Sequence, residues 1–148
     1  MIFSAQNIFS DAQQLAGTSA VPSTNVIDLL APGPRPLDAP ADMVKDFGKG
    51  NPVMIRIQLV AAPTGTTPTL DVVLQGSNAE NFSGAVTLAQ APQLAGGAAG
   101  SVINLTWVPH GTVQRYIRLL YTQGGTSPVY QLTASIVPAL QTNAVPGA

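Results

Sequence analysis

Glycine and proline recur along the whole chain, and this punctuation limits the possible fold more than any other feature of the sequence. The 148 residues include 14 glycines and 13 prolines. Proline breaks the interior of a helix and is poorly tolerated inside a central strand, whereas glycine and proline together mark turns. Long helices are therefore interrupted repeatedly, while short strands joined by turns fit the spacing. The sequence predicts an all-β protein.

The regular strand-like runs begin after residue 52. In "VMIRIQLV" (53–60), apolar side chains alternate with Arg56 and Gln58, as in a strand with one face in the core and the other in water. The comparable later runs are "TLDVVLQGS" (69–77), "AVTLAQ" (85–90), "VINLTWV" (102–108), "RYIRLLY" (115–121) and "VYQLTASIV" (129–137). Between the last two, "TQGGTSP" predicts a hairpin loop.

The length allows one domain with a core of its own and is too short for two of ordinary size. We divide this single domain, 1–148, into an N-terminal arm (1–23), a strand plus proline-rich loop (24–52), a main β-sandwich (53–137) and a flexible C-terminal tail (138–148). In the second region, "STNVIDLL" is the expected strand and "APGPRPLDAP" the loop. About seven strands, or eight if residues 41–47 pair, favour an antiparallel sandwich or a small barrel.

Charge is scarce, which argues against several classes of partner. Charged residues make up 9% of the chain, and the net charge is −1. Such a chain has no overall field to attract nucleic acid or an anionic membrane. No run reaches the ~20 apolar residues of a membrane span, and the opening stretch lacks the basic start and continuous apolar run of a signal peptide. The chain has no cysteine, so it needs no disulfides to fold in a reducing cytoplasm.

The residues that most often carry chemistry do not form a convincing site in the sequence. His110 is the single histidine and stands in the turn "VPHG", with no nucleophile or orienting partner indicated. Asp38, Asp42 and Asp46 would share one helix face, but Pro40 interrupts that helix and favours a solvated loop. We therefore expect no catalytic residues, no metal, no cofactor and no small-molecule substrate.

One run combines cations with aromatic rings. Alternation in "RYIRLLY" places Tyr116 and Arg118 on one face and Arg115 and Tyr121 on the other. Stacking rings beside cations would suit a carbohydrate or a single-stranded nucleic acid. Ordinary cross-strand pairing on a sheet is the simpler interpretation, because two arginines in a nearly neutral protein create a small field.

Several strings, taken together, resemble a known family. "MIFSAQNIFSDAQQL", "STNVIDLLAPG", "DFGKGNPV", "LDVVLQGSNAENFS" and "RYIRLLYTQGG" occur in an order and spacing similar to those of the small capsid cement, or decoration, proteins of tailed bacteriophages of the Bordetella-phage type. The resemblance runs from Met1 to about Val137. It departs from the family pattern in "APGPRPLDAP" and in the Ala/Gly segment at 95–100.

The resemblance implies a jelly-roll β-sandwich, a homotrimer and a structural role in the virion. A protein of this kind sits on the outer surface of the head, bridges neighbouring major capsid proteins and stabilises the expanded shell, after synthesis in the bacterial host cytoplasm. No enzymatic activity comes with the family. The alternative function is a carbohydrate-binding β-sandwich, with Trp107, Tyr116 or Tyr121 as the stacking platform; an enzyme is a more distant third.

The opening stretch supplies the candidate contact residues between subunits or with the capsid: Ile2, Phe3, Ile8 and Phe9. Burying four large apolar side chains would contribute on the order of 6 to 12 kcal/mol per chain before the cost of ordering the arm. The same residues would equally well complete the core of their own chain. In the adjoining "FSDAQQL", Ser10 is a candidate cap for one or two helical turns.

Overall fold

The computed structural model describes residues 7–29, 49–110 and 114–139, and every strand pairing in it is antiparallel. The strands are β1 (Ile8–Ala16), β2 (Val21–Pro22), β3 (Ile27–Asp28), β4 (Val53–Leu59), β5 (Thr64–Ser77), β6 (Val86–Gln90), β7 (Leu94–Ala95), β8 (Val102–Trp107) and β9 (Tyr116–Val137). The prediction of an all-β, antiparallel, sandwich-like fold is confirmed. The predicted loop at 31–40 and all but the first two residues of the predicted tail lie outside the described residues.

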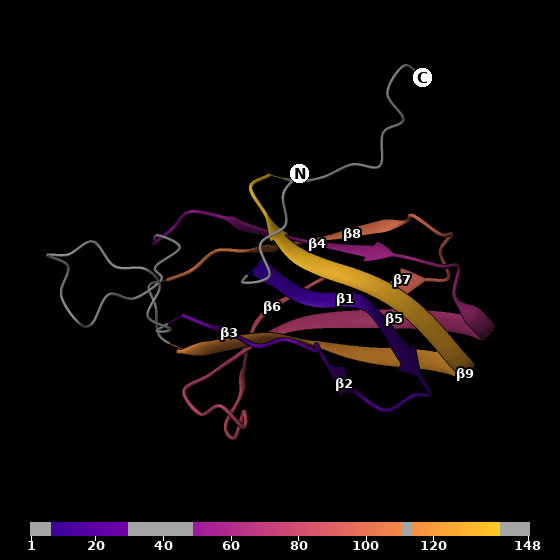
Figure 1. Ribbon diagram of the computed structural model, residues 1–148, viewed down its shortest axis with the longest axis horizontal. Coiled ribbons are helices and arrows are strands. Elements are labelled where there is room, and N and C mark those ends of the chain that lie inside the picture. The colour runs from indigo at the N-terminus through magenta and orange to yellow at the C-terminus, as the bar shows by residue number, and fades with distance from the viewer. Residues whose placement is uncertain (1–6, 30–48, 111–113, 140–148) are drawn as a thin grey trace, which may run out of the picture.

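The strands form two layers that share β9. The first half of β9 pairs with β5, β2 and β3, and β5 in turn pairs with β6 and β7; we call this the β5 layer. The second half of β9 pairs with β1 and β4, and β4 pairs with β8; this is the β4 layer. In Figure 1 the two halves of β9, orange and yellow, meet at a corner on the right and both extend to the left from it, one in each layer. One continuous strand therefore connects the two layers.

The corner of β9 is built on facing glycines. A Cβ atom on Gly125 would lie 2.6 Å from the carbonyl oxygen of Thr67, and one on Gly65 would lie 2.7 Å from that of Ser127. Both glycines also have positive φ, +102° and +106°. The register between β5 and β9 shifts on both sides of this point, between Thr64 and Thr69. The two strands thus turn the corner together at a backbone separation that no side chain allows.

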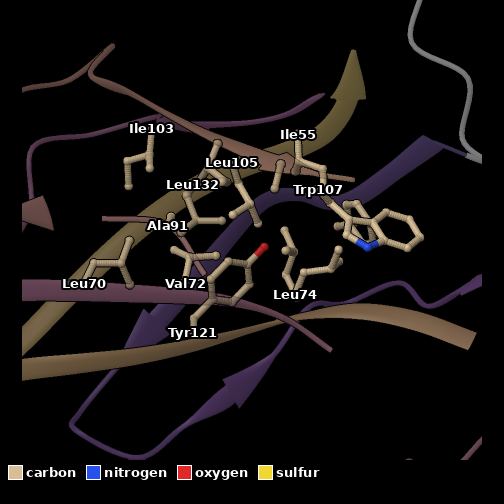
Figure 2. Close-up of a cluster of buried hydrophobic side chains, with 14 of the residues drawn as sticks. Ile55, Leu70, Val72, Leu74, Ala91, Ile103, Leu105, Trp107, Tyr121 and Leu132 are labelled. Carbon is tan, nitrogen blue, oxygen red and sulfur yellow. The ribbon is translucent and has the colours of Figure 1, made fainter. Parts of the chain in front are cut away.

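The core lies between the two layers and is filled mainly by alternate residues of β4, β5, β8 and β9. Figure 2 shows side chains of both layers in one cluster, among them Leu74 and Tyr121 of the β5 layer and Ile55 and Leu132 of the β4 layer. Phe9, Leu15 and Ile27 belong to the same buried cluster. The core therefore includes side chains from β1 and β3, N-terminal to the region at 53–137.

Most of the expected strands are present, with one difference at "TQGGTSP". The sequence predicts a loop between two hairpin strands here, but the segment belongs to β9, which continues from Tyr116 to Val137. Hairpin strands would pair with each other, whereas the two halves of β9 pair with β5 on one side of the corner and with β1 and β4 on the other. The glycines allow β9 to bend and continue as one strand, rather than forming a loop between two strands.

The N-terminal segment also differs from its expected local structure. The helical turn predicted in "FSDAQQL" is part of β1, and Ser10 is buried within the sheet rather than capping a helix. Pairing with β9 shifts register between Ile8 and Ser10 and again between Ser10 and Gln13, and Ala12 there has a φ of +46°. This irregularity interrupts the alternation of apolar side chains, which explains why the sequence does not read as a strand.

Replacing Gly125 by alanine should destabilise the protein strongly. The added methyl group meets the backbone of β5, and φ is unfavourable for a side chain, so we expect a loss of ~2–5 kcal/mol in the free energy of unfolding. Gly84→Ala is the control, because φ there is +69° and nothing lies within 4 Å of the added Cβ; it should cost about 1 kcal/mol. Urea denaturation of both variants measures the difference, and equal losses would contradict the role given to the corner.

Candidate functional site

The two described residues of the predicted contact set lie on β1. Phe9 has no exposed surface and belongs to the core of its own chain, whereas Ile8 is half-buried and pairs with Ser135 of β9. The amide of Asn25 donates to the Phe9 carbonyl at 2.8 Å, and the Asn25 side chain donates to the Ile8 carbonyl at 3.2 Å. Ile2 and Phe3 lie outside the described residues. The intersubunit or capsid contact of this set stays a prediction.

Next to Phe9, a buried polar network joins the two layers. The Ser10 Oγ donates to Gln13 Oε1 at 2.7 Å and lies 2.8 Å from the Tyr121 hydroxyl. Because the single Ser10 hydroxyl proton is directed at Gln13, the Tyr121 hydroxyl is the donor of the second bond. Burial raises the pKa of Tyr121 far above its ordinary value, so the hydroxyl stays protonated. The network ties β1 of the β4 layer to the first half of β9.

At one end of the β5 layer, Arg115 fixes the position of β3. Its Nε donates to Asp28 Oδ1 at 3.0 Å and its Nη2 donates to Oδ2 at 2.9 Å, while its carbonyl accepts the Leu29 amide at 2.8 Å. The hydrogen bonds to Asp28 raise the pKa of the Arg115 guanidinium. The Arg115 side chain is partly exposed, so this bidentate pair contributes modestly to stability and mainly sets geometry.

Arg118 is held by a ring and an amide on the outer face of the same layer. Its guanidinium carbon lies 4.0 Å from the centroid of the Phe82 ring, and its Nε donates to Gln75 Oε1 at 3.0 Å. Gln75 is also its cross-strand neighbour on β5. Partial burial lowers the pKa of Arg118, although an arginine stays charged at neutral pH. Arg118 therefore makes the kind of cross-strand contact that the sequence predicts.

The three aromatic residues considered as a stacking platform do not form one. Trp107 and Tyr121 are buried in the core, at 8% and 0% exposure. Tyr116 is half-buried, and the Arg115 guanidinium carbon lies 4.9 Å from its ring centroid. The alternation predicted for this run holds for Tyr116, Arg118 and Tyr121, while Arg115 precedes β9 and pairs with Asp28 instead. A stacking surface would therefore depend on Tyr116 alone.

The residues weighed for chemistry are either isolated or outside the described part of the chain. His110 is exposed at a bend after β8. Asp38, Asp42 and Asp46 fall outside the described residues. Within 7–29, 49–110 and 114–139, no three histidine, cysteine, aspartate or glutamate side chains gather as metal ligands would. In the same ranges, no helix is long and apolar enough to span a membrane.

The sequence pattern indicates no functional role for Arg56. Among the arginines that the structure describes, Arg56 is the one with neither an acidic partner nor a ring contact. Its Nε is buried and has no hydrogen-bond partner within the described ranges. Alternation in "VMIRIQLV" predicts the face on which Arg56 lies. The missing counter-charge depends on the neighbouring strands and is visible only in the fold.

The Ser10–Tyr121 network makes an asymmetric prediction for stability. Tyr121→Phe leaves Ser10 bonded to Gln13 and should cost about 1 kcal/mol, whereas Ser10→Ala leaves the Tyr121 hydroxyl buried without this partner and should cost ~1–3 kcal/mol. The double variant should recover part of the larger loss.

Tyr130→Phe is the matched control, because the Tyr130 hydroxyl is buried and finds no hydrogen-bond partner among the described residues. Its free energy of unfolding should change little. Chemical denaturation of the four variants tests the network, and equal, additive losses for Ser10→Ala and Tyr121→Phe would contradict it.

Comparison with known proteins identifies the family. The family model described as Bbp16 matches residues 9–137. That span runs from β1 to the end of β9 and takes in both layers of the sandwich. A search of the curated proteins finds no match. Because the family model covers most of the chain, the protein belongs to the Bbp16 family, a family of Bordetella phage proteins.

Proposed function

We propose that this member of the Bbp16 family is a capsid cement protein, which binds the outside of the phage head, bridges neighbouring major capsid proteins and stabilises the expanded shell. The observation that carries the proposal is the match to a phage family along the whole sandwich. Within phage proteins, the strings "STNVIDLLAPG" and "RYIRLLYTQGG" favour a cement protein, because they resemble segments of cement proteins in particular. The role is structural, with no enzymatic activity, no cofactor and no nucleic-acid, membrane or small-molecule partner.

The strand connectivity suits a protein that must carry load. β9 spans 22 residues and hydrogen-bonds to strands of both layers. A pull on the β4 layer is therefore transmitted to the β5 layer through a covalent backbone as well as through side-chain packing. A bridge between capsid proteins needs this property, because pressure from the packaged genome acts to separate them.

The low content of charged residues supports a surface that binds other proteins. Interface cores contain few charged residues, and this chain has only 13 charged residues among 148. The proposal includes a homotrimer on the outer surface of the virion, assembled from chains made in the host cytoplasm. Three linked copies convert later contacts into intramolecular ones, which raises overall binding by ~10² to 10⁴ without a new type of contact.

Binding to expanded shells tests this function. The purified protein should co-sediment with expanded shells of its cognate major capsid protein, saturate at a fixed ratio and raise the temperature at which the shells break. Unexpanded shells serve as the comparison for dependence on expansion. A failure to bind correctly expanded shells would overturn the cement function.

Two nested deletions separate the predicted contact set from the core. Removing residues 1–7 leaves β1 intact and should preserve the melting temperature while weakening self-assembly or shell binding. Removing residues 1–9 also takes Phe9 from the core and should cost ~3–5 kcal/mol of stability. Calorimetry measures the melting temperature, light scattering measures self-assembly, and co-sedimentation measures shell binding. If the shorter deletion changes neither self-assembly nor shell binding, the predicted contact role of Ile2 and Phe3 is wrong.

A further inference from the structure

The outer face of the β5 layer carries an apolar pair. Val73 of β5 and Leu120 of β9 are cross-strand neighbours, and both side chains are half-buried. They point away from the core, because the residues that follow the alternation inward, such as Val72 and Tyr121, have no exposed surface. In Figure 1 this pair of strands, magenta and orange, lies below β4 and β8. An apolar centre that keeps exposed surface among polar neighbours is the usual anatomy of a protein interface.

Side chains of opposite charge lie on the two sides of this apolar pair. Arg118 is two residues before Leu120 on β9, and Asp71 is two residues before Val73 on β5. Two residues along a strand lead to the next side chain of the same face, so both charges share the face with the apolar pair. Because β5 and β9 are antiparallel, the two steps lead in opposite directions along the sheet. The face therefore presents a cation, an apolar centre and an anion in that order; we call these four residues the β5 patch.

Both charged side chains of the β5 patch are held in position within their own chain. The Arg118 guanidinium carbon lies 4.0 Å from the centroid of the Phe82 ring, and its Nε donates to Gln75 Oε1 at 3.0 Å. Asp71 Oδ2 accepts a hydrogen bond from Gln93 Nε2 at 2.9 Å. Arg118 and Asp71 are half-buried, so each keeps exposed surface for a partner. Charged groups fixed in this way lose less conformational entropy when a partner binds.

The order of charges on the β5 patch is complementary to itself. Two copies of the face can be placed opposite each other, with a two-fold axis passing through the apolar pair in the plane of contact. Arg118 of each copy then faces Asp71 of the other, and the two apolar pairs meet at the centre. Such an isologous contact makes every pairing twice. The same face of a second copy thus supplies the charges that the patch requires, in the order that it requires them.

We propose that the β5 patch joins two copies of this chain across a two-fold axis, with Arg118 of each copy bound to Asp71 of the other. This inference rests on the proposed cement function and adds a contact between neighbouring cement proteins. An isologous contact pairs chains two at a time and does not close a ring of three. In the proposed assembly it therefore links one homotrimer to the next. The high effective concentration of copies bound to one shell favours this contact.

A single introduced cysteine can report what lies against the β5 patch, because the chain has no cysteine of its own. Leu120→Cys is labelled with a maleimide–benzophenone photo-crosslinker, mixed with an excess of unlabelled wild-type chain and irradiated on expanded shells. The same mixture is irradiated as free protein at high concentration. We expect covalent adducts of two copies in both samples. The control is Val60→Cys, which lies outside the patch and whose wild-type side chain is 46% exposed; it should give about tenfold fewer adducts of two copies.

Charge reversal tests the pairing of Arg118 with Asp71. Arg118→Glu or Asp71→Lys, present in both the labelled and the unlabelled chain, places like charges opposite each other and should lower the adduct yield by about tenfold or more. Mixing labelled Arg118→Glu chains with unlabelled Asp71→Lys chains should restore the yield, because every contact between the two then joins opposite charges. Asp71→Asn lowers the yield without altering Arg118, and it provides a second variant if Arg118→Glu melts early. The exposed charges reversed in Asp11→Lys and Lys49→Glu are the controls and should leave the yield unchanged.

The outcomes separate this inference from the function on which it rests. If the protein binds shells but the label at position 120 gives no adducts of two copies, the contact is wrong and the cement function stands. If the label joins the major capsid protein instead, the patch has a different occupant and this inference is wrong. If folded variants of opposite charge fail to restore the yield when mixed, the two-fold pairing is wrong. If the protein does not bind shells, the cement function fails, and the adducts of the free protein decide the contact between copies.

Discussion

The close passage of two backbones at Gly65 and Gly125 is the constraint on which the rest of this structure depends. Because each glycine approaches the carbonyl oxygens of the other strand, β5 and β9 bend at the same point without separating. The bend carries β9 from one layer into the other. Tyr121 and Leu132 therefore belong to the same core although they lie on opposite sides of the corner of one strand (Figure 2).

The few polar and charged groups of the described chain are used to fix particular contacts. Ser10 and Tyr121 join the layers in the interior, Arg115 and Asp28 hold β3, and Arg118 lies on Phe82. Arg56 departs from this pattern, because it has no counter-charge in the described chain.

The sequence predicts the elements of this fold better than their arrangement. Alternation of apolar and polar side chains identified β4, β8 and both halves of β9, since each has one face in the core. It did not identify "TQGGTSP" as part of a bent strand, because turn-forming residues look alike whether their flanking strands pair with each other or with distant ones. The pattern likewise did not predict β1, because its pairing with β9 is irregular around Ala12 and interrupts the alternation. Among the contact candidates, the pattern could not decide that Phe9 fills its own core, and it could not detect the missing counter-charge of Arg56.

The protein is a two-layered sandwich joined by one continuous strand and belongs to a phage family, and its proposed role is that of a mechanical bridge on the head. Cryo-electron microscopy of expanded heads, prepared with and without this protein, tests that claim most directly. We predict added density on the outer surface only in the decorated heads, fitting the sandwich and contacting more than one major capsid protein. Density inside the shell, at the tail, or on a single capsid protein without a bridge would contradict it.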